Sequence, residues 1–402
     1  MTWLHYGIAA AVACVVTMAL VPPVRKLAFK LDAVDYPSAR RVNKKPTARF
    51  GGVAMFGGLI AGLLTIWIGS QFFGWHYPLH SPVSRNIWYP GVACGVVLIF
   101  LVGAADDIWD LRPKQKLLGQ IVAASIVAAS GLLLSDMHNP IGAGYIDFGI
   151  WAYPITVFYL VAFMNIINLI DGLDGLASGI TAISAFTMFT FAVLTFRVDA
   201  AFLCAGLIGI CLGFLRYNFN PASIFMGDSG SLLLGMSLGI VSLFATTRSA
   251  LFVSLLVPIL VAGVPIIDTA SAIIRRLRAH QPIQQADNGH IHHQLLKEGF
   301  SQRETVLIMW GWTVILAISA IFVTETHGAW RLVFIALAFG VSAFFIVRLH
   351  LLGQVLRHHY DPRPAVGQKR ACEEFNEAVD ETRSNDDRHD GDAPNRDTRP
   401  AR

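Results

Sequence analysis

The stretch MNIINLIDGLDGLASG, residues 164–179, decides how this chain folds. It closes an apolar run that begins near Trp151, yet it carries two amides and two carboxylates at three-residue intervals. These are Asn165, Asn168, Asp171 and Asp174. A charged side chain at membrane depth is costly, and such residues mark functional sites by default. A fold prediction must therefore explain both the apolar run and the polar residues that end it.

The composition is typical of a membrane protein. Hydrophobic residues make up 54% of the chain and charged residues 14%, whereas a soluble domain is about 25% charged. Apolar runs of about 17 to 25 residues, the length that spans a bilayer, recur along almost the whole sequence. We predict an all-α polytopic membrane protein with eleven transmembrane helices. Their expected bounds are 3–22, 50–73, 88–105, 117–135, 150–168, 175–196, 200–216, 229–247, 250–270, 305–324 and 330–350.

The chain is expected to have two parts. Residues 1–353 form a transmembrane catalytic domain, with the active site in cytoplasmic loops. Residues 354–402 are polar, carry charges of both signs and contain few large apolar residues. A segment of that composition does not bury enough apolar surface to fold, so we predict a disordered cytoplasmic tail.

The positions of Lys and Arg predict the orientation. If the N-terminus is outside, the segments that face the cytoplasm hold all but four of the 31 Lys and Arg residues. The exceptions are Arg85, Arg197, Arg248 and Arg331. Because Lys and Arg accumulate on the cytoplasmic side of a membrane, we predict an external N-terminus and a cytoplasmic C-terminus. The expected location is the plasma membrane.

The other polar clusters lie in the same predicted cytoplasmic segments as the opening stretch. Asp106 and Asp107 are adjacent and precede several cationic residues. Adjacent carboxylates can serve as a proton acceptor and a metal neighbour, while lysines neutralise phosphate oxygens. Asp228 lies between Gly227 and Gly230, which let the backbone approach a phosphate or a metal closely. The alternative is that these carboxylates only cap helices at the membrane edge.

An unbroken helix would not bring the four polar residues of the opening stretch together. At about 100° per residue, Asn165 and Asp174 would point about 180° apart. Gly172 and Gly175 supply the break that convergence requires, since glycine tolerates strained backbone and close approach. The alternative is that Asp171 and Asp174 merely cap the following helix.

A histidine group completes the candidate chemistry. Its members are His290, His292 and His293. No cysteine accompanies them and their spacing is not an i, i+4 pair, so they do not indicate zinc. They fit better as donors or cations at a diphosphate, with solvated interfacial histidines as the alternative. Clustered carboxylates with flanking Lys, Arg and His indicate a magnesium-assisted reaction of a diphosphate substrate. The membrane body implies that the second substrate is a lipid.

Taken together and in this order, the motifs resemble the polyprenyl-phosphate N-acetylhexosamine-1-phosphate transferases, glycosyltransferase family 4. The resemblance covers roughly residues 30–310. It rests on KKPTARFGG (44–52), DDIWDLRPKQKLLGQ (106–120), NIINLIDGLDGLASG (165–179), NPASIFMGDSGSLLLG (220–235), PIIDTASAIIRR (265–276) and GHIHHQLLKEGFS (289–301).

The resemblance implies transfer of a sugar 1-phosphate from a UDP-sugar to undecaprenyl phosphate, with release of UMP. Such a reaction is the first membrane step of a cell-wall or surface polysaccharide pathway. The resemblance also implies Mg²⁺ as cofactor, with Mn²⁺ as an alternative, and the lipid bilayer as a partner beside the two substrates. No nucleic acid is expected as a partner, and a homodimer remains an open alternative.

The family's functional residues carry over to matching positions. The magnesium ligands correspond to Asn168 and Asp228. The pair beside the lipid phosphate, one of which takes its proton, corresponds to Asp106 and Asp107.

Further positions correspond to the nucleotide and sugar ends of the family's site. Active-site carboxylates near the nucleotide correspond to Asp171 and Asp174, and an aromatic residue that stacks on uracil corresponds to Phe225. The candidates for phosphate contacts are Arg49, Lys114 and Lys116. The loop that holds the sugar phosphate end corresponds to His290, His292 and His293.

The histidine loop also predicts the branch of the family. The branch that uses UDP-MurNAc-pentapeptide usually has three consecutive histidines, whereas this chain has His-Ile-His-His at 290–293. It is similar instead to the branch that uses UDP-GlcNAc, and eleven spans rather than ten favour the same branch. A phospho-MurNAc-pentapeptide transferase of peptidoglycan synthesis is the alternative.

The predicted mechanism is direct attack of the lipid phosphate on the β phosphorus, with a covalent aspartyl intermediate as the alternative. A cation-coupled transporter could also carry intramembrane carboxylates. Transporters place these near the bilayer midplane, often between repeated halves. Here the carboxylates gather at predicted cytoplasmic ends and the sequence has no internal repeat, so an enzyme is favoured. A structural scaffold is a third interpretation.

Overall fold

The computed structural model describes residues 3–36, 46–75, 87–138, 145–246, 263–278, 291–326 and 329–348. Every described element belongs to one compact unit, Met1–Leu352. The predicted tail at 354–402 and the predicted site residue His290 lie outside the described residues.

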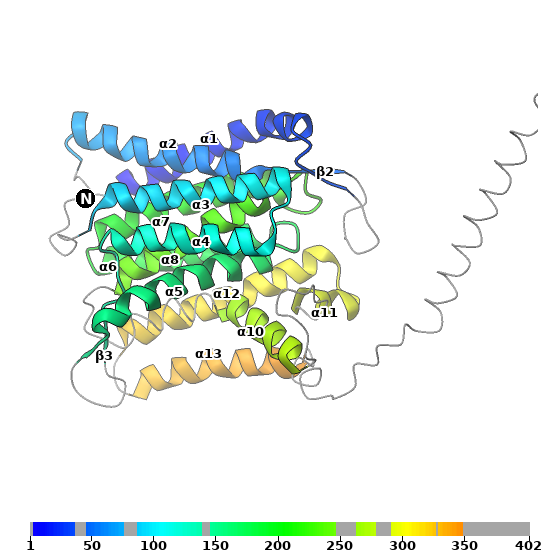
Figure 1. Ribbon diagram of the computed structural model, residues 1–402. Coiled ribbons are helices and arrows are strands. Elements are labelled where there is room, and N and C mark those ends of the chain that lie inside the picture. The colour runs from blue at the N-terminus through cyan, green and yellow to red at the C-terminus, as the bar shows by residue number, and fades with distance from the viewer. Residues whose placement is uncertain are drawn as a thin grey trace, which may run out of the picture. The chain divides into compact units, whose positions relative to one another are not determined.

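Helices make up most of this unit, and most of the long ones lie side by side (Figure 1). They are α1 (Trp3–Lys30), α2 (Gly51–Phe72), α3 (Tyr89–Trp109), α4 (Pro113–Ala129), α5 (Ala152–Ile170), α6 (Leu176–Leu194), α7 (Val198–Asn218), α8 (Gly227–Thr246), α10 (Gly263–Arg278), α11 (Ile291–Lys297), α12 (Gln302–Glu325) and α13 (Ala329–Arg348). A 3-10 turn, η2 (Gly149–Trp151), precedes α5. Within the described ranges, nine helical segments are long and apolar enough to cross a membrane. A helical, polytopic membrane protein is therefore confirmed.

Two of the eleven expected spans are not among these nine. The expected span 117–135 is α4, a helix of 17 residues. It begins earlier because Pro113 follows a capping box made by Arg112 and Gln115. It ends at Ala129, Ser130 is its C-cap, and the next residue, Gly131, takes a φ of 86°. The expected span 250–270 lies largely outside the described residues, which resume at α10.

The prediction of an all-α fold missed two small sheets. The first joins β1 (Val34–Asp35), β2 (Thr47–Arg49) and β5 (Ile224–Phe225), with β1 antiparallel and β5 parallel to β2. The second pairs β3 (Asp136–His138) with β4 (Tyr145–Asp147) in antiparallel fashion. Arg49 of β2 pairs in register with Phe225 of β5. The first sheet therefore brings two predicted site residues from distant parts of the sequence side by side.

Helix α8 is the central element of the bundle. It packs against α2, α3, α5, α6 and α7, and it is the most buried of the nine candidate spans in the described structure. Leu233 and Leu234 join one buried apolar cluster, and Leu232 and Met236 join another. Because α8 contacts so many neighbours, the position of its first turn constrains the helices that meet there.

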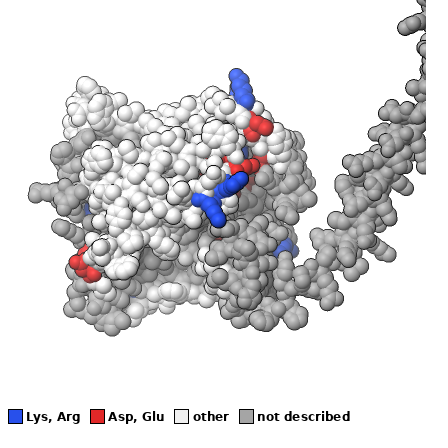
Figure 2. Space-filling model, in the orientation of Figure 1, with Lys and Arg blue, Asp and Glu red and all other residues white. Residues whose placement is uncertain are grey.

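Exposed aromatic side chains occur at both ends of the bundle, since Trp109 at the end of α3 is also exposed, whereas charged side chains concentrate at one end. Exposed aromatic residues lie where several helices begin or end at the end that holds the N-terminus (Figure 1). They are Trp3, Phe72, Trp88, Trp151 and Trp330. Aromatic side chains of this kind are enriched at membrane–water interfaces. On the face shown in Figure 2, charged side chains gather chiefly at the opposite end, near β2, and the surface between the ends is mostly uncharged.

Two glycines allow the first turn of α8 to approach its neighbours. A Cβ at Gly103 of α3 would lie 2.6 Å from the Asp228 carbonyl oxygen and 2.6 Å from the Ser229 nitrogen. A Cβ at Gly52 of α2 would lie 2.1 Å from the Gly230 nitrogen. These are backbone atoms, so a rotamer change would not relieve the overlap. Glycine is therefore required for α2 and α3 to contact the start of α8.

Replacing Gly103 with alanine should destabilise the protein. The methyl group must displace the α8 backbone, and overpacking of this kind costs about 1–3 kcal/mol. Thermal unfolding in detergent should therefore begin at a lower temperature for Gly103→Ala. Gly311→Ala on α12 is the control, because a Cβ there would meet none of the described residues within 4 Å. Equal unfolding temperatures for the two variants would contradict the packing described here.

Candidate active site

The buried carboxylate of Asp107 caps the N-terminus of α8. Asp107 is 2% exposed. Its Oδ1 accepts a hydrogen bond from the Asp228 nitrogen at 2.7 Å. Its Oδ2 accepts from the Ser229 nitrogen at 3.0 Å and from the Ser229 hydroxyl at 2.5 Å. A carboxylate in this place satisfies N–H groups that have no partner within the helix and interacts favourably with the helix dipole. Asp107 therefore fixes α8, and with it Asp228, to the end of α3.

Arg49 ties the end of α3 to the first sheet. Its Nη2 donates to the carbonyl oxygens of Asp106 and Asp107 at 3.3 and 3.4 Å, and to Asp110 Oδ1 at 2.9 Å. Its Nε lies 3.8 Å from Asp107 Oδ1. A cation at the C-terminus of a helix satisfies unpaired carbonyls and complements the helix dipole. Because Arg49 also lies beside Phe225, the sheet and α3 are held in one arrangement.

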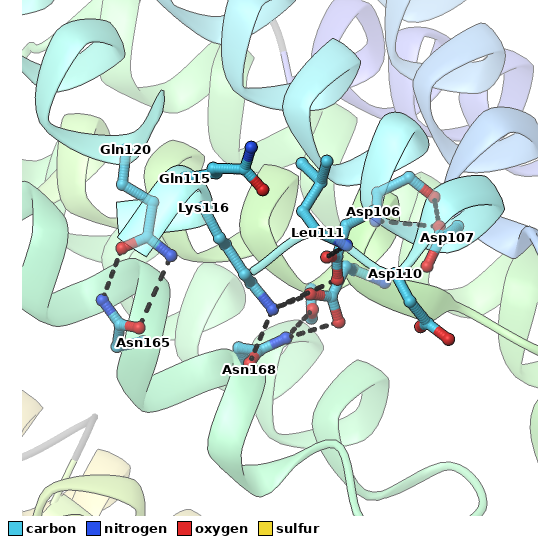
Figure 3. Close-up of polar contacts among 12 residues, drawn as sticks. Asp106, Asp107, Asp110, Leu111, Gln115, Lys116, Gln120, Asn165 and Asn168 are labelled. Carbon is cyan, nitrogen blue, oxygen red and sulfur yellow. Dashed lines mark hydrogen bonds and ion pairs between the residues drawn. The ribbon is translucent and has the colours of Figure 1, made fainter. Parts of the chain in front are cut away.

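Lys116 of α4 lies at the centre of the site (Figure 3). Its ammonium is 3.6 Å from Asp106 Oδ2 and 3.5 Å from Asn168 Oδ1, and it contacts Asp228 Oδ2 in an ion pair. Asn168 Nδ2 donates to Asp228 Oδ1 at 2.9 Å and to the Ser231 hydroxyl at 2.8 Å. Helices α3, α4, α5 and α8 thus bring two carboxylates, one amide and one ammonium together.

The oxygen atoms around this ammonium suit a hard divalent cation. Asp106, Asp228 and Asn168 each present one side-chain oxygen to the same positive charge. Magnesium takes oxygen ligands, and it commonly uses one or two carboxylates while substrate phosphates and water complete its shell. Among the described residues, no group of three or more His, Cys, Asp or Glu side chains could hold a metal. The two carboxylates and one amide oxygen around Lys116 match the small number of protein ligands that Mg²⁺ commonly takes.

The opening stretch breaks where its glycines predicted. Helix α5 ends at Ile170 and α6 begins at Leu176, and Gly175 takes a φ of 81°. Within the turn, Asp174 Oδ2 accepts hydrogen bonds from Asn220 Nδ2 and from the Ala222 nitrogen, both at 3.0 Å. Asp174 therefore fixes the turn to the segment that leads into β5.

Asp171 differs from the other carboxylates of the site. It is half-buried, and its side chain makes no hydrogen bond or ion pair with the residues that the structure describes. Burial, followed by the negative charges of Asp107 and Asp174, raises the pKa of Asp171 well above its ordinary range. Asp171 therefore holds a proton more tightly than an exposed aspartate does.

The histidine loop lies against this turn. A Cβ at Gly172 would lie 2.9 Å from His292 Nε2, so glycine permits the imidazole to approach the backbone. His292 is buried, and its ring centroid lies 4.4 Å from that of His293. Asp268 Oδ1 of α10 accepts a hydrogen bond from the Ile291 nitrogen at 2.7 Å, which fixes the start of α11. The structure thus brings His292 to the turn that carries Asp171.

Two of the predicted site residues lie outside the contacts around Lys116, and three residues that shape the site were not predicted from the sequence. Lys114 is exposed on the first turn of α4, and Phe225 is half-buried on β5. The hydroxyls of Ser229 and Ser231 were not predicted, although both lie within three residues after Asp228 in the motif. Asp268 was also missed, and its position within PIIDTASAIIRR was the only signal that could have identified it.

Comparisons with known proteins agree with this geometry. The model of the family "Glycosyl transferase family 4" matches residues 89–246, which include α3, α4, α5 and the first turn of α8. The "Probable undecaprenyl-phosphate N-acetylglucosaminyl 1-phosphate transferase" of Bacillus subtilis is 38% identical over 328 residues, which cover 82% of this chain and 87% of that protein. The "Decaprenyl-phosphate N-acetylglucosaminephosphotransferase" of Mycobacterium tuberculosis H37Rv is 36% identical over 333 residues, covering 77% and 80% respectively.

A relative with a different named substrate is less similar. The "Phospho-N-acetylmuramoyl-pentapeptide-transferase" of Desulforudis audaxviator is 30% identical over 337 residues, covering 77% of this chain and 96% of that protein.

Removal of the Asp107 carboxylate should destabilise the start of α8. Asp107→Ala leaves the buried N–H groups of Asp228 and Ser229 without their acceptor, which costs about 1–3 kcal/mol. Asp110→Ala is the matched control, because it also removes a carboxylate from Arg49. The Asp110 side chain is 87% exposed, and an exposed ion pair contributes only about 0–1 kcal/mol. Thermal unfolding in detergent should separate the two variants, and equal losses would contradict the capping role.

Asp171→Asn should stabilise the protein at high pH. Because the folded-state pKa is raised above the ordinary value of 3.8, ionisation of Asp171 disfavours the folded state. The folding stability of the wild-type protein therefore falls as the pH rises above the ordinary aspartate pKa of 3.8. It stops falling once the pH exceeds the raised pKa of Asp171. The asparagine variant has no such loss. Thermal unfolding without divalent cations should show a difference that grows with pH, and a constant difference would contradict the assignment.

Proposed function

The chain belongs to glycosyl transferase family 4, and on that premise we propose that it transfers GlcNAc 1-phosphate from UDP-GlcNAc to undecaprenyl phosphate. UMP leaves, and the product is undecaprenyl diphosphate-linked GlcNAc. The relatives with the higher identities are named for GlcNAc 1-phosphate transfer to a polyprenyl phosphate, which supports this sugar over MurNAc-pentapeptide. The product would begin a cell-wall or surface polysaccharide.

One observation carries the proposal. Side-chain oxygens of Asp106, Asn168 and Asp228, which come from three helices, converge on the ammonium of Lys116 from a fourth. Such a group of oxygens and one ammonium can bind a divalent cation and a diphosphate at the same time. It lies at the charged end of a bundle that is otherwise suited to lipid. A lipid phosphate and a soluble nucleotide sugar could therefore meet there.

We propose that Asp228 and Asn168 are the protein ligands of Mg²⁺, with Asp106 facing the same position. When bound, the metal would neutralise negative charge on the diphosphate oxygens. The Lys116 ammonium would add a second positive charge for the phosphates. Asn168 is oriented for this role by its hydrogen bonds to Asp228 and Ser231.

The proposed reaction is a direct displacement. An oxygen of the lipid phosphate attacks the β phosphorus, a new P–O bond forms, and the bond from that phosphorus to the oxygen shared with UMP breaks. Of the adjacent carboxylates, Asp106 is assigned as the proton acceptor because its Oδ2 faces the polar centre. Both oxygens of Asp107 accept hydrogen bonds from the α8 terminus, so Asp107 is assigned as a positioning residue.

The remaining predicted residues fit the nucleotide and sugar ends of the substrate. Phe225, which lies beside Arg49, is the proposed stacking partner of uracil. His292 lies at the turn that carries Asp171, where it could donate a hydrogen bond to a phosphate oxygen. A protonated Asp171 could approach a diphosphate without repelling it. We also propose that the β2 end of the bundle faces the cytoplasm, as the distribution of Lys and Arg predicts.

The test is UMP release by purified protein with undecaprenyl phosphate. UDP-GlcNAc, UDP-GalNAc and UDP-MurNAc-pentapeptide would be compared, each with Mg²⁺ and with a chelator. We expect release with UDP-GlcNAc only when Mg²⁺ is present, and a loss of kcat of about 10²-fold or more in Asp228→Asn. Asp136→Asn, at the opposite end of the bundle, should retain activity, since an amide oxygen can still accept the bond from Ser135.

Three results would contradict parts of this proposal. Faster UMP release from UDP-MurNAc-pentapeptide than from UDP-GlcNAc would identify the former as the substrate. Full activity of Asp228→Asn would contradict the assignment of Asp228 to the active site. Exchange of labelled UMP into UDP-GlcNAc without lipid would indicate a covalent intermediate instead of direct displacement.

A further inference from the structure

A pair of side-chain amides joins α4 to α5 one turn away from the polar centre (Figure 3). Asn165 Nδ2 donates to Gln120 Oε1 at 2.7 Å, and Gln120 Nε2 donates to Asn165 Oδ1 at 3.4 Å. Asn165 Nδ2 also donates to the Val161 carbonyl oxygen at 2.8 Å. Gln120 is 1% exposed. The two amides therefore satisfy each other inside the helix interface.

Apart from Gln120, the buried side chains of α4 are apolar and mostly small. The other buried residues of α4 are Ala123, Ala124, Val127 and Ala128. Contacts between such side chains are non-directional and would tolerate a slide or rotation of one helix against the other. Hydrogen bonds depend on distance and angle, so a reciprocal amide pair permits only one register. Farther along the same interface, the Tyr153 hydroxyl of α5 donates to the Ser125 carbonyl oxygen of α4 at 2.7 Å, and the amide pair is the directional contact that lies next to Lys116 and Asn168.

The register of the pair determines the geometry at Lys116. Lys116 precedes Gln120 by four residues on α4, and Asn168 follows Asn165 by three residues on α5. Residues at these separations lie on the same face of a helix. The amide pair and the contact of 3.5 Å between Lys116 and Asn168 are therefore successive contacts along one interface.

We propose that Gln120 and Asn165 are positioning residues that set the register of α4 on α5 and thereby place Lys116 against Asn168 and Asp228. Neither amide touches the reacting groups in this assignment. The inference rests on the proposed function for its catalytic readout, because Asn168 and Asp228 are the proposed metal ligands. Loss of the pair should displace Lys116 and Asn168 relative to each other.

The variants that test this are Gln120→Leu, Asn165→Leu and the exchange Gln120→Asn with Asn165→Gln. The exchange keeps one amide on each helix and the same total side-chain length. We expect each leucine variant to lose kcat by about 10²-fold, the effect of a displacement of about 1 Å near reacting groups. Mn²⁺ alone, measured by electron paramagnetic resonance, should bind at least several-fold more weakly to each leucine variant. The exchange variant should recover most of the wild-type kcat and most of the wild-type affinity for Mn²⁺.

Tyr159→Phe is the matched control. Tyr159 also lies on α5, and its hydroxyl shares a hydrogen bond of 2.8 Å with the Ser242 hydroxyl of α8. The variant loses one interhelical hydrogen bond away from Lys116. Its unfolding temperature should fall as it does in the leucine variants, while kcat and Mn²⁺ affinity should stay at the wild-type values.

The outcomes separate this inference from the proposed function. Absence of UMP release by the wild-type protein would overturn the proposed function, and the Mn²⁺ measurement would still test the register. Wild-type kcat and Mn²⁺ affinity in the leucine variants would overturn the positioning role. An exchange variant no better than the leucine variants would also overturn it.

Discussion

The site depends on one interaction, the capping of α8 by the buried carboxylate of Asp107. Three hydrogen bonds from Asp228 and Ser229 end on this one side chain. The approach is close enough to require glycine at positions 52 and 103. Because α8 is also the most buried of the candidate spans in the described structure, its first turn cannot shift without disturbing several neighbours. Asp228 is thereby held in place before any ligand arrives, which is the preorganisation that electrostatic catalysis requires.

The polar residues of the opening stretch are tolerated because three of the four have partners. Asn165 pairs with Gln120, Asn168 bonds to Asp228 and Ser231, and Asp174 holds the segment before β5. Of the four, only the Asp171 side chain makes no bond to the described residues, and burial together with the charges of Asp107 and Asp174 raises its pKa. A buried polar group without a partner is costly. The unpartnered carboxyl group of Asp171 therefore supports a role in binding substrate rather than in folding.

The sequence predicted the helices and the segments that form the site. It did not predict the role of each side chain within the site. Apolar runs report burial in lipid, so ten of the expected spans correspond to described helices, although α4 is displaced because its start depends on a cap and a proline. Asp106 and Asp107 are neighbours in sequence, and adjacent residues on a helix point about 100° apart. Only the position of α8 shows that one carboxylate faces the polar centre and the other caps a helix. Short strands and the partner of Gln120 depend on contacts between distant segments, which no local pattern reports.

Binding of Mn²⁺ to the purified protein without substrates tests the central claim most directly. We expect one bound Mn²⁺ in the wild-type protein, weaker binding by about 10-fold or more in Asp228→Asn, and unchanged binding in Asp136→Asn. Equal Mn²⁺ affinity in all three proteins would contradict the claim that the oxygens around Lys116 form the metal site.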